Sequence, residues 1–314
     1  MKRILITGGA GNIGSSLAER LAANPDNEIV IVDNLLTGNI SKLPKNRDNV
    51  IFIKADVNDF RDISSIMLSF NFDFVFHYAA VVGVARTLKN PKMVLDDIEG
   101  IKNILNLSKN TNVKKVFYSS SSEVYGEPVE IPQFEDTTPL NSRLPYAIVK
   151  NIGEAFIKSY NQEFGLDYTI FRFFNTYGPN QSTDFVIAKY INLAIHNKDI
   201  SIYGDGSQTR TFCYIDDNLD TIERILNEKL LDNQVLNIGS DIEISILELA
   251  KKIINLLNSK SRITFLPPLK EGDMTRRKPD IEKMMKVLKR DLTDLDSGIL
   301  LTAKFWQKSN KTSD

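Results

Sequence analysis

A tyrosine and a lysine four residues apart, Tyr146 and Lys150, form the pair in this sequence that is best suited to proton transfer. Residues at this spacing lie on one face of a helix. A free phenol has a pKa of about 10 and is a poor base at neutral pH, but a nearby cation favours the phenolate. The pair could therefore remove a proton from a substrate hydroxyl group. A packed tyrosine beside a surface lysine would show the same spacing.

The glycine-rich segment Gly8–Gly14 repeats glycine at every third position, between an apolar run and a helical pattern that begins at Ser15. Glycine lets the backbone turn tightly and approach a pyrophosphate, which then faces the helix N-terminus. The second apolar run ends in Asp33, whose carboxylate would bind the ribose hydroxyls of adenosine. Because Asp33 would repel a 2′-phosphate, the pattern predicts NAD rather than NADP. A structural turn with a capping aspartate is the alternative. We expect Asp56, at the end of the third strand, near the adenine.

Short apolar runs alternate with helical patterns through the first half of the chain. The predicted strands are Ile4–Thr7, Glu28–Val32, Val50–Lys54, Phe74–His77, Lys115–Ser119 and Asp167–Phe173; the predicted helices are Ser15–Ala23, Asp59–Phe70, Pro91–Asn110 and Tyr146–Phe164. Such alternation predicts an α/β fold with a Rossmann-type, doubly wound parallel sheet. After about Asn175 the strands shorten and Gly and Pro become frequent, although a helix is expected over Ile246–Asn258. We expect an NAD-binding domain over 1–174, to which 212–235 returns, and a smaller C-terminal α/β cap over 175–314 that binds substrate.

The composition argues against several classes of protein. Lys and Arg total 39 and Asp and Glu total 40, so the net charge of -1 creates no field for holding nucleic acid or membranes. The 2 histidines and 1 cysteine argue against a metal site of the His/Cys type. A single cysteine, Cys213, cannot form an internal disulfide, which fits a cytoplasmic location. The N-terminal apolar run is too short for a signal peptide.

These motifs together resemble the extended short-chain dehydrogenases/reductases, in the group of nucleotide-sugar epimerases, dehydratases and decarboxylases. The resemblance runs from Lys2 to about Ile281. It implies an NAD-dependent enzyme that oxidises its sugar to a 4-keto intermediate, with Tyr146 and Lys150 at the cofactor. The other cofactor contacts that we expect are Gly8, Gly11, Asn12, Ile13, Gly14, Asp33, Asn34, Gly38, Asp56, Val57, Ala79 and Ala80.

The resemblance also implies the substrate contacts. Ser121 would donate a hydrogen bond to the C4 oxygen of the sugar, with Ser122 and Glu123 completing the catalytic set. A strand end that merely caps a turn is the alternative for these serines. The expected contacts of a nucleotide sugar, expected to be UDP-linked, are Asn175, Arg210 and Arg276 or Arg277. Planar guanidinium groups suit phosphate oxygens.

The second step of the reaction separates the members of this group. Ser122-Glu123 stands where dehydratases carry Asp-Glu, and a serine hydroxyl is too weak an acid to expel the C6 hydroxyl. Glu123 also differs from simple 4-epimerases, whereas Ser-Glu and an arginine matching Arg277 resemble UDP-glucuronate decarboxylases. Decarboxylation is thus the first expectation and UDP-sugar 4-epimerisation the alternative. Dehydration and a non-catalytic NAD-binding regulator remain further alternatives.

Relatives of this kind use two helices per subunit to form dimers. The matching segments here are Pro91–Leu107 and Tyr146–Tyr160, and we expect a homodimer by analogy.

Overall fold

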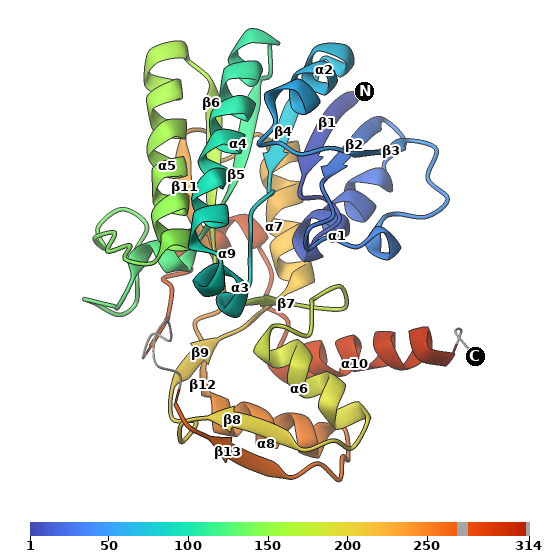
Figure 1. Ribbon diagram of the computed structural model, residues 1–314, viewed down its shortest axis with the longest axis vertical. Helices are drawn as coiled ribbons and strands as arrows, with labels where there is room; N and C mark the ends of the chain where they lie inside the picture. The colour runs from blue at the N-terminus through green and yellow to red at the C-terminus, as the bar shows by residue number, and fades with distance from the viewer. Residues whose placement is uncertain (269–275, 312–314) are drawn as a thin grey trace.

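A seven-stranded parallel sheet forms the centre of the computed structural model, which describes residues 1–268 and 276–311. The strand order is β11-β6-β5-β4-β1-β2-β3 (Figure 1). The strands are β1 (Lys2–Thr7), β2 (Asn27–Asp33), β3 (Val50–Lys54), β4 (Phe74–His77), β5 (Lys115–Ser121), β6 (Asp167–Phe173) and β11 (Gln234–Ile238). The order reverses between β1 and β4, as in a doubly wound sheet, and the predicted fold class is confirmed.

Both faces of the sheet are covered by helices, which explains why its inner strands are nearly continuous apolar runs. Ile4 and Ile6 pack in one apolar cluster with α1 (Asn12–Ala22) and α7 (Ile215–Glu228). The intervening Leu5 belongs to the opposite cluster, because successive side chains of a strand point to opposite faces. The second cluster contains side chains of α2 (Phe60–Phe70), α4 (Pro91–Asn110) and α5 (Pro145–Phe164).

The first helix begins three residues earlier than expected, at Asn12 rather than Ser15. Gly11 is the N-cap in an extended conformation, and the backbone N–H of Ser15 donates to the carbonyl oxygen of Gly11 at 3.1 Å. The glycine turn is therefore shorter, and its last part already lies in the helix. The helix α3 (Val84–Lys89) was not predicted, since its apolar sequence continues from the preceding strand.

The C-terminal part is built from small sheets and three helices (Figure 1). The two-stranded sheets pair β7 (Thr176–Tyr177) with β10 (Cys213–Tyr214), β8 (Ile200–Tyr203) with β13 (Ile263–Leu266), and β9 (Thr209–Thr211) with β12 (Glu243–Ser245). The helices are α6 (Val186–Ile195), α8 (Ile246–Leu256) and α10 (Leu295–Lys311). The chain returns to the large sheet with α7 and β11, and again with α9 (Glu282–Leu288), which packs against them. The two-domain division itself stays a prediction.

The C-terminal helix is fastened to the loop that follows β7. The indole N–H of Trp306 on α10 donates to the carbonyl oxygen of Pro179 at 2.7 Å. In the next residue, the side-chain amide of Asn180 donates to the hydroxyl oxygens of Ser15 and Ser16 on α1, each at 3.3 Å. The loop thus connects α10 to the helix that follows the glycine turn.

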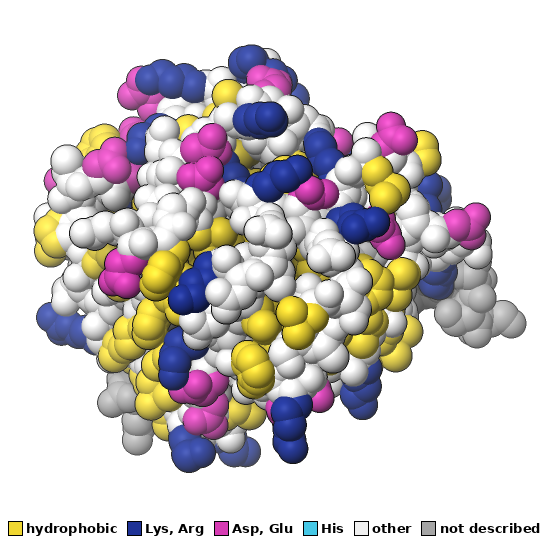
Figure 2. Space-filling view, turned by 90° about the horizontal axis from the view of Figure 1, so that it is seen from above, with side chains coloured by type: hydrophobic (Ala, Val, Ile, Leu, Met, Phe, Trp, Pro, Cys, Tyr) yellow, Lys and Arg dark blue, Asp and Glu magenta, His cyan; other side chains and the backbone are white. Residues whose placement is uncertain are grey.

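The surface seen from above carries both signs of charge, with Lys and Arg side chains interspersed among Asp and Glu (Figure 2). Within the described ranges, every helix is too short or too polar to cross a bilayer.

Candidate active site

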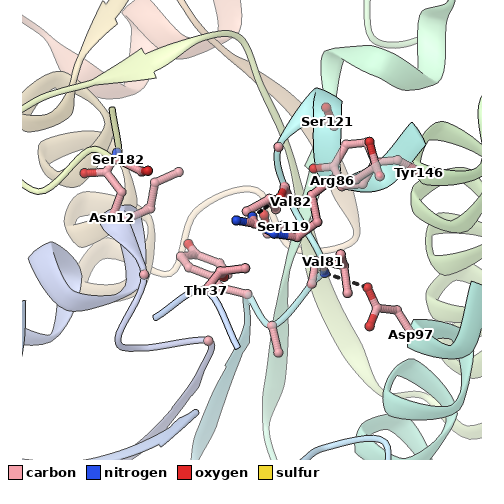
Figure 3. A pocket seen from close by; sticks show the side chains of 18 of the residues that line it. Asn12, Thr37, Val81, Val82, Arg86, Asp97, Ser119, Ser121, Tyr146 and Ser182 are labelled. Atoms are coloured by element: carbon pink, nitrogen blue, oxygen red, sulfur yellow. Dashed lines mark hydrogen bonds between the residues drawn. The ribbon is translucent and has the colours of Figure 1, made fainter. Parts of the chain in front are cut away.

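A cavity of about 700 Å³ opens at the carboxyl ends of the central strands. Ligands bind at this edge in doubly wound sheets, where the strand order reverses. Its walls come from both parts of the chain: the glycine turn and the β5 end on the sheet side, and Asn175 and the start of α6 on the other. In Figure 3, Asn12 and Ser182 lie on one side of the cavity and Ser121 and Tyr146 on the other.

The glycine turn forms a cradle that side chains would fill. Gly8 has a φ of +66°, and a Cβ there would lie 2.6 Å from the backbone nitrogen of Ala79. The Asp33 carboxylate lines the cavity at the end of β2. It accepts hydrogen bonds from the backbone N–H groups of Ala10 at 2.9 Å and Leu35 at 2.7 Å. These bonds fix the carboxylate at the β2 end, and its cavity-lining position fits the ribose of a dinucleotide.

Most of the predicted cofactor residues lie together on this cavity. Gly8, Gly11, Asn12, Ile13, Gly14, Asp33, Asn34, Asp56, Val57, Ala79, Ala80 and Tyr146 all line it. Gly38 lies behind the wall, where a Cβ would come within 2.7 Å of the Asp33 carboxylate. The Asn34 amide donates to Asp56 at 3.0 Å, which links the ends of β2 and β3. The glycine turn, which leaves room for a pyrophosphate, and the carboxylates at the ends of β2 and β3 therefore fit NAD.

The Tyr146 side chain lines the cavity near the N-terminus of α5. Burial raises the pKa of the Tyr146 phenol well above its ordinary value, and the Glu123 carboxylate raises it further. A side-chain hydrogen bond with Ser121 and the positive charge of Arg277 both lower the same pKa. If this phenol acts as a base, as predicted, it depends on nearby donors and cations to lose its proton.

Lys150 lies one turn further along α5 and is buried. Its ammonium group donates to the carbonyl oxygen of Ser119 at 2.6 Å and lies 5.7 Å from the centre of the Tyr146 ring. Burial lowers the pKa of Lys150 to about 8, while the Asp97 carboxylate acts to raise it. The predicted pair is thus brought together, with the lysine charge beside the phenol.

A partly buried ion pair completes this end of the cavity. Glu123 belongs to the short turn η2 (Ser122–Tyr125) that follows β5, and its carboxylate accepts from an Arg277 Nη at 2.7 Å. Ser121, Ser122, Glu123 and Arg277 all line the cavity. Arg277 reaches the β5 end from the C-terminal part of the chain, so the two parts meet at the phenol.

The other predicted substrate residues lie in different places. Asn175 lines the cavity, and its amide donates to the carbonyl oxygen of Thr211 at 3.0 Å. The neighbouring Arg210 is buried outside the lining, with an Nη donating to the Thr209 carbonyl at 2.7 Å. Arg276 is also outside the lining and binds the Glu243 carboxylate at 2.6 and 2.5 Å. Of the two adjacent arginines, Arg277 is therefore the one that faces the cavity.

Several charged residues in the lining were not predicted, and Asp97 and Arg86 are two of them. The Asp97 carboxylate of α4 accepts the backbone N–H of Val81 at 2.7 Å (Figure 3), and burial raises its pKa. Arg86 of α3 donates to the Val82 carbonyl at 2.7 Å and lies 3.5 Å from Asp184 across the cavity mouth. Asp97 had a sequence signal, because it lies on the same helix face as the buried Val94 and Ile101. Arg86 had none.

A model of the NAD dependent epimerase/dehydratase family matches residues 4–239. The chain belongs to this family, and it is an NAD-dependent enzyme of the nucleotide-sugar-modifying, extended short-chain dehydrogenase type. Its cofactor is NAD. The resemblance deduced from the motifs is confirmed.

The relatives include both epimerases and decarboxylases. A UDP-N-acetyl-alpha-D-glucosaminuronate decarboxylase from Bacillus cytotoxicus is 35% identical over 91% of each chain. A putative UDP-glucose 4-epimerase from Methanocaldococcus jannaschii is 33% identical over 98% of this chain and 100% of its own. The crystal structure of a Thermotoga maritima UDP-glucose 4-epimerase with UDP-glucose has a TM-score of 0.92 and 29% identity, covering 98% of this chain and 99% of its own.

Proposed function

We propose that the protein decarboxylates a UDP-linked hexuronate, with UDP-glucuronate as the first substrate to test. The observation that supports this most directly is the partly buried ion pair of Glu123 and Arg277 beside Tyr146. A guanidinium group there can bind the C6 carboxylate of a hexuronate with two parallel hydrogen bonds. A neutral hexose offers no group that requires such a cation.

The chemistry divides among residues of this chain. Tyr146 takes the proton of the C4 hydroxyl, Ser121 donates to the C4 oxygen, and the charge of Lys150 favours the phenolate. NAD held at the glycine turn and Asp33 would supply the acceptor, and later the donor, of the C4 hydride. The C4 ketone is β to the carboxylate, so it takes up the electron pair that remains at C5 when the bond to carbon dioxide breaks. Arg277 orients the carboxylate for this step, and C5 then gains its proton from a water molecule that the Glu123 carboxylate orients, which leaves a hydroxide ion for the released carbon dioxide.

The two parts of the chain would share the binding work. We assign NAD to residues 1–174 and the returning segment 212–235, and the nucleotide sugar mainly to 175–314. Asn175 is the predicted diphosphate contact that lines the cavity, while Arg210 and Arg276 remain predicted contacts outside it. The buried thiol of Cys213 is unpaired, which fits work in a reducing cytoplasm.

A homodimer is part of the proposal. The helices α4 and α5 lie side by side (Figure 1) and expose Leu95 and Phe164 to solvent. A second copy of the chain would cover these apolar side chains.

UDP-sugar 4-epimerisation is the second candidate. The relatives that support it are the M. jannaschii putative epimerase, which aligns over its full length, and the T. maritima epimerase. Dehydration is disfavoured, since Ser122 lines the cavity where an acid would have to protonate the departing hydroxyl.

The direct test supplies UDP-glucuronate and UDP-glucose separately, with NAD, and follows carbon dioxide release and the sugar product. We expect carbon dioxide and a UDP-pentose from the acid. Loss of the charged contact in Arg277→Ala should lower kcat/KM for UDP-glucuronate by about 30- to 100-fold. The matched control Arg61→Ala removes an exposed arginine on α2, remote from the cavity lining, and should change little. A C4 epimer of UDP-glucose without carbon dioxide from the acid would establish the epimerase instead.

A further inference from the structure

A buried glutamate lies on the same helix face as the catalytic pair. Glu154 follows Lys150 by four residues and Tyr146 by eight, and it is 1% exposed. Its carboxylate accepts the Ser120 hydroxyl at 2.6 Å. It also accepts two hydrogen bonds from Arg172 on β6, from Nε at 2.9 Å and from an Nη at 2.7 Å. Ser120 and Arg172 are 2% exposed, so the network is shielded from bulk water, while Ser120 also borders the cavity.

Arg172 also donates hydrogen bonds to residues that follow β5 in the chain. One Nη of Arg172 donates to the Tyr125 hydroxyl at 2.8 Å and to the carbonyl oxygen of Glu135 at 3.0 Å. The Tyr125 hydroxyl donates in turn to Asn237 at 2.8 Å. A buried ion pair is favourable only with such geometry and satisfied partners, and losing one partner leaves an uncompensated buried charge.

Ser120, the β5 residue of this network, lies between two residues that interact with the catalytic pair. The carbonyl oxygen of Ser119 accepts from Lys150 at 2.6 Å, and the side chain of Ser121 lies close enough to Tyr146 to lower the pKa of its phenol. Ser120 lies between Ser119 and Ser121 and binds Glu154, which is one turn further along α5 than Lys150. Three consecutive residues of β5 therefore contact three positions of one helix, each four residues apart.

We infer that the buried network of Ser120, Glu154 and Arg172 positions the catalytic tyrosine and lysine of the same helix. The inference rests on the proposed roles of that pair. A helix held only by apolar packing can shift by fractions of an ångström, and small misplacements lower catalytic rates. The network fixes α5 against the β5 end through charged hydrogen bonds, which are short and strongly directional.

Other groups facing the pair set its charge, and the network sets its geometry. Tyr146 is faced by Glu123 from η2, Asp97 from α4 and Arg277. Lys150 is faced by Asp97, the buried His77 of β4 and the Tyr118 ring of β5, the last at 5.2 Å. None of the three network residues is among them. A change in Ser120 therefore affects the pair only through the position of α5, and it removes no charge.

The test is Ser120→Ala, which deletes one hydroxyl and leaves the ion pair intact. Glu154→Gln would leave Arg172 buried without its partner charge and could prevent folding. The control is Ser108→Ala, which removes a buried serine hydroxyl on α4 outside the network, one with no hydrogen-bond partner among the described residues. Both variants are compared with the wild-type protein by kcat, KM and NAD affinity across pH.

We expect Ser120→Ala to lower kcat at neutral pH by about tenfold, with KM and NAD affinity within about twofold of wild type. Weaker support of the phenolate should move the acidic limb of the kcat–pH profile to higher pH by about one unit, so part of the rate returns as pH rises. A smaller folded fraction would instead reduce kcat equally at every pH. Such a uniform loss, or a profile equal to that of Ser108→Ala, would overturn the inference.

The test of the network can succeed or fail independently of the test of the proposed reaction. The assay uses whichever UDP-sugar the wild-type protein turns over, since oxidation at C4 is common to decarboxylation and epimerisation. A wild type active only on the hexose would contradict decarboxylation, while the comparison of Ser120→Ala with Ser108→Ala would still decide the role of the network.

Discussion

Tyr146 is partly buried, and the proposed mechanism requires its phenol to lose a proton. Burial and Glu123 raise the pKa of its phenol, so the Ser121 hydrogen bond and the positive charge of Arg277 have to oppose them. Helical spacing was enough to predict that Lys150 joins this residue, because positions four apart share a face. It could not predict the contact of Arg277 with Glu123, which depends on the path of the C-terminal chain.

Replacing the phenol tests the catalytic role directly. Tyr146→Phe should lower kcat by roughly 10²- to 10⁴-fold, as expected when a general base is lost. NAD affinity should stay within a few-fold, since the ring and the glycine turn remain; calorimetric titration measures this. The control is Tyr160→Phe, which removes another α5 hydroxyl, one that donates to Asn106 at 2.7 Å outside the cavity. Full activity in Tyr146→Phe would exclude the residue from the mechanism.

The helix α5 shows how far the sequence determines an element. Its end at Phe164 was predicted and its start was missed by one residue, because its apolar pattern and Gly165 mark the limits clearly. Which residues of α5 face the sheet was not predictable in the same way. Glu154, like Asp97 of α4, lies among buried positions of its helix, yet a carboxylate there is normally expected to face water. Only the packing against β5 and β6 reveals the partners that make its burial favourable.

The approach of α5 to β5 depends on Gly153. A Cβ at this position would overlap the hydroxyl oxygen of Tyr118 on β5. We therefore expect Gly153→Ala to lower the free energy of unfolding by about 1–3 kcal/mol through overpacking, although alanine favours helices. Urea unfolding measures the loss. Ser159→Ala, on the exposed face of α5, should stay within about 0.5 kcal/mol of wild type. Equal stability of Gly153→Ala and wild type would show that the two elements can separate at little cost.

At the scale of the whole molecule, the active site forms where the two parts of the chain face each other. The parallel sheet was predictable from alternating strand and helix patterns, and the bounds of β3, β4 and β6 match those expected. The short strands after residue 175 pair over long sequence separations, as when β12 joins β9 and β13 joins β8. Such pairing leaves little local signal, so the shape of the cap and the inward course of Arg277 emerged only from the structure.

The proposed homodimer is a property of the assembled molecule. We expect sedimentation velocity at micromolar concentration to give the mass of two chains. Leu95→Glu places a charge on the exposed apolar face of α4 and should shift the protein towards monomer, because an unpaired charge disfavours a buried interface. Leu68→Glu makes the same change on exposed α2 and should leave the dimer intact. A wild-type protein that sediments only as monomer would reject the dimer.

The anchoring of α10 by Trp306 gives the protein a built-in optical reporter. The chain has 1 tryptophan, so its indole emission arises from a single place, where the C-terminal helix meets Pro179. Because Asn180 next to it holds Ser15 and Ser16 of α1, the fluorophore is coupled to the helix whose first turn lines the cavity. Loosening of the C-terminal helix and occupancy of the nucleotide cradle can thus be followed by light emission without any attached dye.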